Sequence, residues 1–93
     1  MKYNQYTLTK LEKLLQSMAY SVRYGQGNFQ SGHCIVHENK VVVINKFYDI
    51  QGRINTLIDI VKSLEFHEEN LDAKELRFLE EIKNIKEEEN IIL

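Results

Sequence analysis

The chain has 93 residues, of which 43% are apolar, and its formal net charge is −2. This length predicts a single domain over residues 1–93, and the composition excludes a disordered chain. A chain with a net charge this close to zero is not expected to have the basic surface that nucleic-acid-binding proteins carry. The single cysteine excludes an internal disulfide bond, and the sequence shows no signal peptide and no apolar run of membrane-spanning length. We therefore expect a cytoplasmic protein.

The first predicted element is a helix from about Thr9 to Ala19. Its apolar residues recur at helical spacing: Leu8, Leu11, Leu14, Leu15 and Met18. Thr9 followed by Glu12 predicts a capping box at the start of this helix, with Thr7 as the alternative cap.

Three strands are predicted next. Alternation of apolar and polar residues over 20–24 indicates the first strand, and 33–38 and 40–46 indicate a hairpin. Asn39 could supply a positive φ in the turn between the last two. Because 41–44 is apolar at every position, we expect Val43 and Ile44 to lie in the core.

Two helices complete the predicted fold. The apolar spacing over 50–65 indicates the first, with Asp49 as its N-cap, and the spacing over 71–93 indicates the second. The predicted fold class is α+β, with a helix, a three-stranded antiparallel meander and then two helices (α-β-β-β-α-α).

The glycine-rich stretch 24–32 does not match a nucleotide-binding loop. A dinucleotide-binding fingerprint requires the pattern G-x-G-x-x-G between a strand and a helix. Here Gly25, Gly27 and Gly32 have a different spacing, and a strand follows them. The glycines are therefore interpreted as a turn or bulge between strands, and no cofactor is expected.

The neighbouring histidines and cysteine do not form a predicted metal site. His33 and His37 are four residues apart on a strand, which places them roughly 13 Å apart, too far to share a zinc ion. Cys34 alternates to the opposite face and is interpreted as a small buried apolar residue. A nucleophilic Cys–His pair would need a nearby base and an oxyanion hole, for which the sequence has no signature. We therefore expect no metal and no catalytic residue.

Four polar residues remain as a candidate ligand-binding site. Asn45 and Lys46 end the last strand, and Arg53 and Asp59 lie on the helix that follows. Such a cluster would serve a small hydrolase or a ligand-binding module if the residues converged on a pocket. The alternative interpretation of Asp59 is a charge on the solvent-facing side of the helix.

The segment 20–64, which includes YSVRYGQGNFQSGHCIVHENKVVVINK, resembles a family of small uncharacterised bacterial proteins. The resemblance covers about half of the chain and implies no activity. More distantly, the order helix, strands and then the helix GRINTLIDIVK looks like the front half of the zinc metallopeptidases that cleave phage-type repressors. Their helix has the form R-F-t-x-A-H-E-x-x-H, and Arg53 and Ile54 match its start.

The residues that would bind zinc in that family are replaced here. Ile58 and Lys62 occupy the positions of the two histidines, and Asp59 occupies the position of the glutamate. Since isoleucine and lysine cannot bind zinc as neutral imidazoles do, the resemblance implies the scaffold of a metallopeptidase without its activity.

The sequence favours a non-enzymatic protein that acts through protein–protein interaction. The last helix has more apolar residues than one helix contact requires, and those assigned to an interaction are Phe78, Ile82, Ile85 and Ile92. The partner would be another protein or a second copy of the chain bound through this helix. The alternative is that the helix docks on its own domain.

Overall fold

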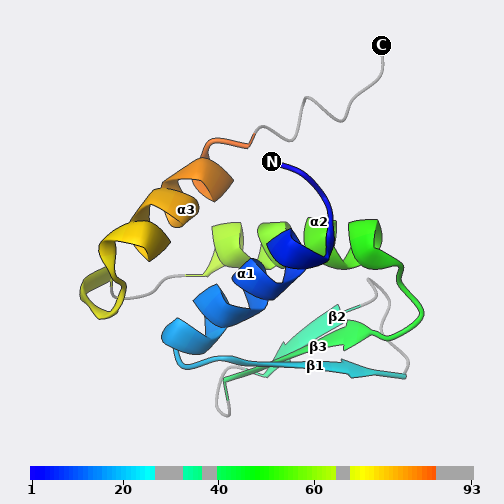
Figure 1. Cartoon of the computed structure of the whole chain (residues 1–93). Coiled ribbons are helices and arrows are strands. Elements are labelled where there is room, and N and C mark those ends of the chain that lie inside the picture. The colour runs from blue at the N-terminus through cyan, green and yellow to red at the C-terminus, as the bar shows by residue number, and fades with distance from the viewer. Residues whose placement is uncertain (27–32, 37–39, 65–67, 86–93) are drawn as a thin grey trace.

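The computed structural model describes residues 1–26, 33–36, 40–64 and 68–85, with the backbone alone for 33–36. In chain order the elements are α1 (Gln5–Ser17), β1 (Ser21–Gly25), β2 (His33–Val36), β3 (Val41–Asn45), α2 (Ile50–Ser63), the 3-10 helix η1 (Glu68–Asn70) and α3 (Ala73–Lys83). The predicted α+β class is confirmed. Figure 1 shows α1 and α2 over the same face of the sheet, with α3 on the far side of these helices from the strands.

The predicted antiparallel meander is wrong. The strand order is β1-β3-β2, so β3 lies in the middle of the sheet. β1 runs parallel to β3, with Ser21 opposite Val41 and Gly25 opposite Asn45. β2 runs antiparallel to β3, with His33 opposite Ile44. The predicted hairpin between the second and third strands is therefore confirmed, and the pairing of the first strand is not as predicted.

The central place of β3 follows from its composition and from the length of the preceding connection. Val41–Ile44 is the most apolar run among the strands, and the central strand of a sheet is the most buried one. Seven residues, 26–32, separate β1 from β2. To pass from β1 to β2 across the position of β3, the chain must move sideways by roughly 10 Å, and seven residues can extend about 23 Å. A meander would need only a short turn at this point.

Only one face of β3 is buried against the helices. The side chains of Val42 and Ile44 are fully buried, whereas those of Val41 and Val43 are partly exposed. Ile44 is therefore a core residue as predicted, but the prediction for Val43 is wrong. Residues that alternate along a strand point to opposite faces. Val42 and Ile44 belong to the buried cluster that α1 and α2 also form, so these helices cover their face.

Helix α1 begins four residues earlier than predicted. Asn4 is its N-cap, because the Asn4 side-chain oxygen accepts a hydrogen bond from the Thr7 N–H at 3.0 Å. Asparagine is a stronger N-cap than threonine, which explains why the helix does not start at Thr9. Thr7 is buried instead, and its hydroxyl donates to the Lys2 carbonyl.

Helix α1 ends in a Schellman motif. The Ala19 N–H donates to the Gln16 carbonyl at 2.9 Å, and the Tyr20 N–H donates to the Leu15 carbonyl at 2.8 Å. Ala19 therefore has a φ of 67°, a region that favours glycine. In the β2–β3 turn the positive φ, 51°, is found at Lys40. Asn39, for which it was predicted, lies outside the described residues.

The two remaining helices are capped by aspartates. Asp49 caps α2 as predicted, accepting from the Gly52 N–H at 2.8 Å. Asp72 caps α3 in a capping box with Glu75, a D-x-x-E signal that the sequence prediction missed. The prediction that this helix continues beyond Lys83 is wrong for Asn84 and Ile85, and 86–93 lies outside the described residues. Asparagine favours helix ends, consistent with Asn84 at the C-cap.

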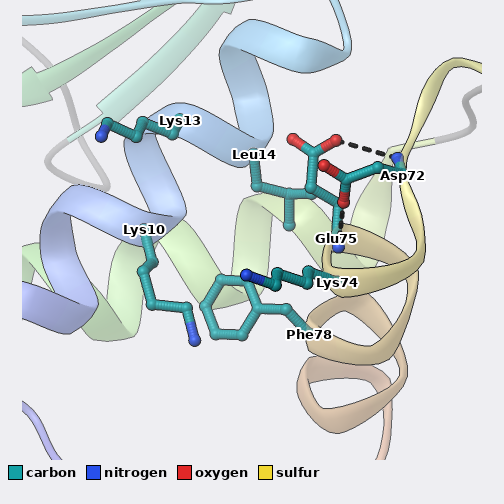
Figure 2. A pocket seen from close by; sticks show the side chains of 7 residues that line it. All are labelled: Lys10, Lys13, Leu14, Asp72, Lys74, Glu75 and Phe78. Atoms are coloured by element: carbon teal, nitrogen blue, oxygen red, sulfur yellow. Dashed lines mark hydrogen bonds between the residues drawn. The ribbon is translucent and has the colours of Figure 1, made fainter.

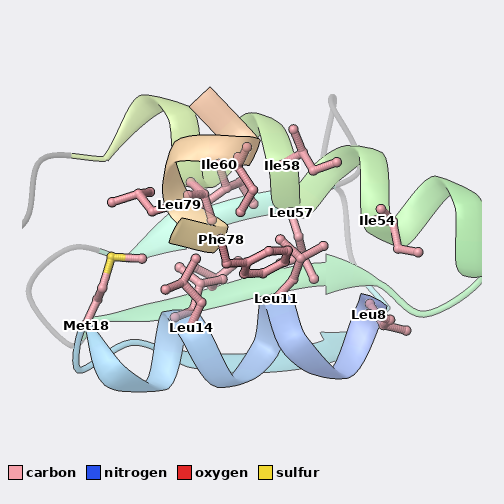
Figure 3. Packing of buried hydrophobic residues seen from close by; sticks show 14 of the residues in the cluster. Leu8, Leu11, Leu14, Met18, Ile54, Leu57, Ile58, Ile60, Phe78 and Leu79 are labelled. Carbon is pink, nitrogen blue, oxygen red and sulfur yellow. The ribbon is translucent and has the colours of Figure 1, made fainter. Parts of the chain in front are cut away.

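One cluster of buried apolar side chains joins the three helices and the sheet. Figure 3 shows α1, α2 and α3 contributing side chains to it, including Leu11, Leu57 and Phe78. Leu79 and Ile82 of α3 are also fully buried. The apolar side of α3 therefore packs against the core of the same molecule.

The Ala19 conformation leads to a stability prediction. Ala19→Gly should raise the free energy of unfolding by about 0.5–1 kcal/mol, because glycine adopts a positive φ without steric cost. The change can be measured by urea unfolding. Ala73→Gly, at the exposed first position of α3, is the matched control and should not raise stability. A loss of stability in Ala19→Gly would contradict the argument.

Candidate functional site

Three of the four polar residues predicted as a ligand site meet where β3 joins α2. The Arg53 Nη2 donates to the Lys46 carbonyl at 2.8 Å, and Nε donates to the Tyr48 carbonyl at 2.9 Å. The Asn45 side-chain oxygen accepts from the Phe47 N–H at 2.9 Å. These bonds hold the turn from the strand into the helix, which gives Arg53 and Asn45 a clear structural role.

Asp59 does not join this group. It lies six residues after Arg53 on α2, which places it about 9 Å further along the helix axis and about 240° around it. Its side chain is exposed, between the buried residues Ile58 and Ile60. Asp59 therefore belongs to a different part of the α2 surface from the Arg53 turn.

A half-buried polar cluster connects α1, β1 and α2. The Tyr24 hydroxyl donates to the Glu12 carboxylate, and the Arg53 guanidinium carbon lies 4.4 Å from the centre of the Tyr24 ring. Burial raises the pKa of Tyr24 well above its ordinary value, and the hydrogen bond and charge of Glu12 raise it further. Arg53 acts on this pKa in the opposite direction. Tyr24 therefore stays protonated.

The sequence prediction missed this cluster, although it contained a signal. Tyr24 was predicted only as part of a strand, and Glu12 only as part of a cap. A tyrosine on the apolar side of an alternating strand requires a partner for its hydroxyl, because burying that group without one is costly. The partner could not be identified before the packing of α1 against β1 was known.

A groove lies between α1 and α3, and we call it the basic groove. One part has a volume of about 230 Å³ and is lined by Lys10, Lys13, Leu14, Asp72, Lys74, Glu75 and Phe78. The adjoining part, about 420 Å³, adds Tyr6, Arg77 and Glu81 and shares Lys10, Lys74 and Phe78. In Figure 2 the two helices face each other across this space, with Phe78 between Lys10 of α1 and Lys74 of α3.

The floor of the basic groove is apolar, and a cation lies over it. Leu14 and Phe78 are buried side chains of the core whose surfaces line the smaller part of the groove. The Lys10 ammonium lies 4.2 Å from the centre of the Phe78 ring and 5.5 Å from that of Tyr6. Such distances allow a cation–π interaction, which holds the ammonium at the groove and not in bulk water.

Two of the three carboxylates that line the groove are hydrogen-bonded to other groups. Asp72 accepts from the Glu75 N–H at 2.8 Å, and Glu75 accepts from the Asp72 N–H at 3.1 Å. Glu75 also accepts from the Ser17 hydroxyl, which joins α3 to α1. Both carboxylates keep their charge, so the basic groove presents four cations from two helices, Lys10, Lys13, Lys74 and Arg77, against three carboxylates, a net charge of +1.

Most of the residues that the sequence analysis assigned to an interaction are buried in the core. Phe78 and Ile82 are buried, at 6% and 0% exposure, and Ile85 is partly buried against the core. The Lys62 ammonium donates to the Ile85 carbonyl at 2.5 Å. Ile92 lies outside the described residues. Of this set, Phe78 contributes to a surface feature, because it lines the basic groove.

The predictions for the histidines and Cys34 cannot be compared with the structure, because the His33 and Cys34 side chains and all of His37 lie outside the described residues. Within the described part of the chain, no group of three His, Cys, Asp or Glu residues could hold a metal ion. The helices described are too short or too polar to cross a membrane. Comparison of the chain with protein-family models, curated proteins and solved structures finds no match.

The Arg53 hydrogen bonds predict a loss of stability on substitution. Arg53→Lys should lower the free energy of unfolding by about 1–2 kcal/mol, because an ammonium cannot donate to both carbonyls and lie flat on Tyr24. Arg23→Lys, at an exposed position on β1, should change it by less than about 0.5 kcal/mol. Equal effects in urea unfolding would show that the Arg53 bonds contribute nothing.

The raised pKa of Tyr24 predicts a loss of stability in alkali. Because this pKa is higher in the folded chain than the unfolded value of about 10, its contribution is complete below pH 10 and is lost as the pH rises toward the folded-state pKa. Between pH 9 and 11 the wild-type free energy of unfolding should fall more steeply than that of Tyr24→Phe. Tyr6→Phe, at an exposed tyrosine, should retain the wild-type slope. Identical slopes in all three proteins would contradict this.

Proposed function

We propose that the chain is a non-enzymatic cytoplasmic protein that acts by binding another protein at the basic groove. The observation that supports this is the combination of an apolar floor, formed by Leu14 and Phe78, with cations supplied by two separate helices. Peptide-binding grooves combine these properties, since apolar side chains provide burial and charged groups select the partner.

The open shape of the groove favours a peptide over a small molecule. Its two parts, about 230 and 420 Å³, are both open to solvent, whereas a typical small-molecule pocket encloses most of its ligand. An open groove between two helices accommodates a few side chains of a larger partner. The partner would supply an apolar side chain for the floor and carboxylates for Lys13, Lys74 and Arg77.

The alternative is a small hydrolase or a ligand-binding module near Asn45, Lys46, Arg53 and Asp59. It has less support, because the Arg53 guanidinium donates to two main-chain carbonyls and Asp59 lies elsewhere on α2. An inactive metallopeptidase-like scaffold is compatible with the binding proposal, because it too would act without catalysis.

The proposal predicts that reversing charges in the basic groove weakens partner binding. A partner captured on the immobilised wild-type chain should be purified, and its affinity for Lys13→Glu/Lys74→Glu should fall at least about tenfold. Both residues are exposed, and a glutamate in the first turn of α3 favours the helix, so the variant should fold. Binding to the wild type should weaken as salt increases.

Arg23→Glu/Lys40→Glu is the matched control. It has the same net charge as the groove variant, but its substitutions lie on β1 and in the turn before β3. It should therefore bind the partner as the wild type does. A partner that binds all three proteins equally would exclude the basic groove as the binding site.

A further inference from the structure

The basic groove is open along α1 and α3. Lys13, Lys74 and Arg77 are exposed, and the groove reaches down to the buried residues Leu14 and Phe78. Its occupant should therefore carry several carboxylates next to apolar residues. The chain itself contains one such segment.

Residues 86–93 read KEEENIIL and have the complementary composition. Glu87, Glu88 and Glu89 are three consecutive carboxylates, and the apolar residues Ile91, Ile92 and Leu93 follow them after one asparagine. The segment thus pairs acidic and apolar parts at a short spacing, as the groove pairs cations with an apolar floor. The segment lies outside the described residues, and its sequence and its reach indicate where it can bind.

The reach of the segment is fixed by Ile85. This residue packs against the core, and its carbonyl accepts from Lys62, so the segment starts from a defined point. Returning from Ile85 to the level of Phe78 covers seven helical residues, about 10 Å, and to Lys74 about 16 Å. Eight extended residues span about 26 Å. A single reversal after Ile85 therefore suffices.

We propose that residues 86–93 fold back and occupy the basic groove of the same molecule, so that a protein partner must displace them. The glutamates would lie against the lysines and Arg77, and the apolar residues against Leu14 and Phe78. The regulatory meaning of this contact rests on the proposed function, since only a partner that uses the same groove would meet the segment as a competitor. Because the segment is tethered, its effective concentration at the groove is in the millimolar range, so even weak contacts would compete.

The fold-back can be tested on the chain of residues 1–93 by paramagnetic relaxation enhancement. A nitroxide label at Leu93→Cys, in a Cys34→Ser background, should broaden the amide signals of Lys10, Lys74 and Phe78. The amide of Phe47, in the turn after β3, should be unaffected. Mixing isotope-labelled unmodified chain with unlabelled nitroxide-carrying chain should remove the broadening. Broadening that persists in the mixture would mean that a second copy supplies the segment, and absence of groove broadening would also overturn the proposal.

A second measurement leaves the cysteine unchanged. A fluorescein-labelled peptide of residues 86–93 should bind Glu87→Lys/Glu88→Lys/Glu89→Lys at least about tenfold more tightly than the wild type, because the groove of that variant has lost its internal ligand. Glu87→Asp/Glu88→Asp/Glu89→Asp keeps the charge and should resemble the wild type. Adding Lys13→Glu/Lys74→Glu to the lysine variant should abolish binding. Equal peptide affinity for all of these proteins would overturn the proposal.

The results separate the two proposals. If the segment does not reach the groove but Lys13→Glu/Lys74→Glu still loses the purified partner, the fold-back is wrong and the proposed function stands. If the segment occupies the groove but the groove variant keeps the partner, the proposed function is wrong, and the fold-back is a structural contact without a competitor.

Discussion

The small area of the three-stranded sheet determines where the helices, and the groove between them, can lie. Three strands about 4.8 Å apart offer a face that two helices, packed 8–10 Å from each other, cover completely. Helices α1 and α2 both lie on this face, so α3 has no access to the strands (Figure 1). It must bury Phe78, Leu79 and Ile82 against the other two helices. Because helices are round in cross-section, α3 leaves a space beside its line of contact with α1 and α2. The basic groove between α1 and α3 is that space.

The local elements were predictable because their signals lie within a few residues. The periodicity of 50–65 identified α2, and Asp49 was recognised as its cap from its position before the first helical turn. The hairpin of β2 and β3 likewise follows from two strand patterns and a short link. The two caps that the prediction missed also have local signals. Both Asn4 and the Asp72–Glu75 capping box could have been recognised from the spacing of nearby residues.

The pairing of β1 and the two polar sites were not predictable in this way. The alternation in 20–24 is the same for a strand next to β2 and for one next to β3, so the pattern cannot distinguish a meander from the observed order. Lys13 and Lys74 each belong to the polar side of a separate helix, and only the packing of α3 beside α1 brings them to one groove. Arg53 was recognised as a candidate, but its partners are main-chain carbonyls, which any sequence provides.

The parallel pairing of β1 with β3 also determines how the sheet can assemble. Ser21 and its partner Val41 are 20 residues apart, whereas Val36 and its partner Val41 in the hairpin are 5 apart. Closing the larger loop costs about 1.2 kcal/mol more chain entropy, if the cost grows with the logarithm of loop length. The hairpin is thus the part of the sheet that can form from near neighbours. The parallel strand joins at a greater entropic cost, which the packing of α1 against the sheet helps to offset.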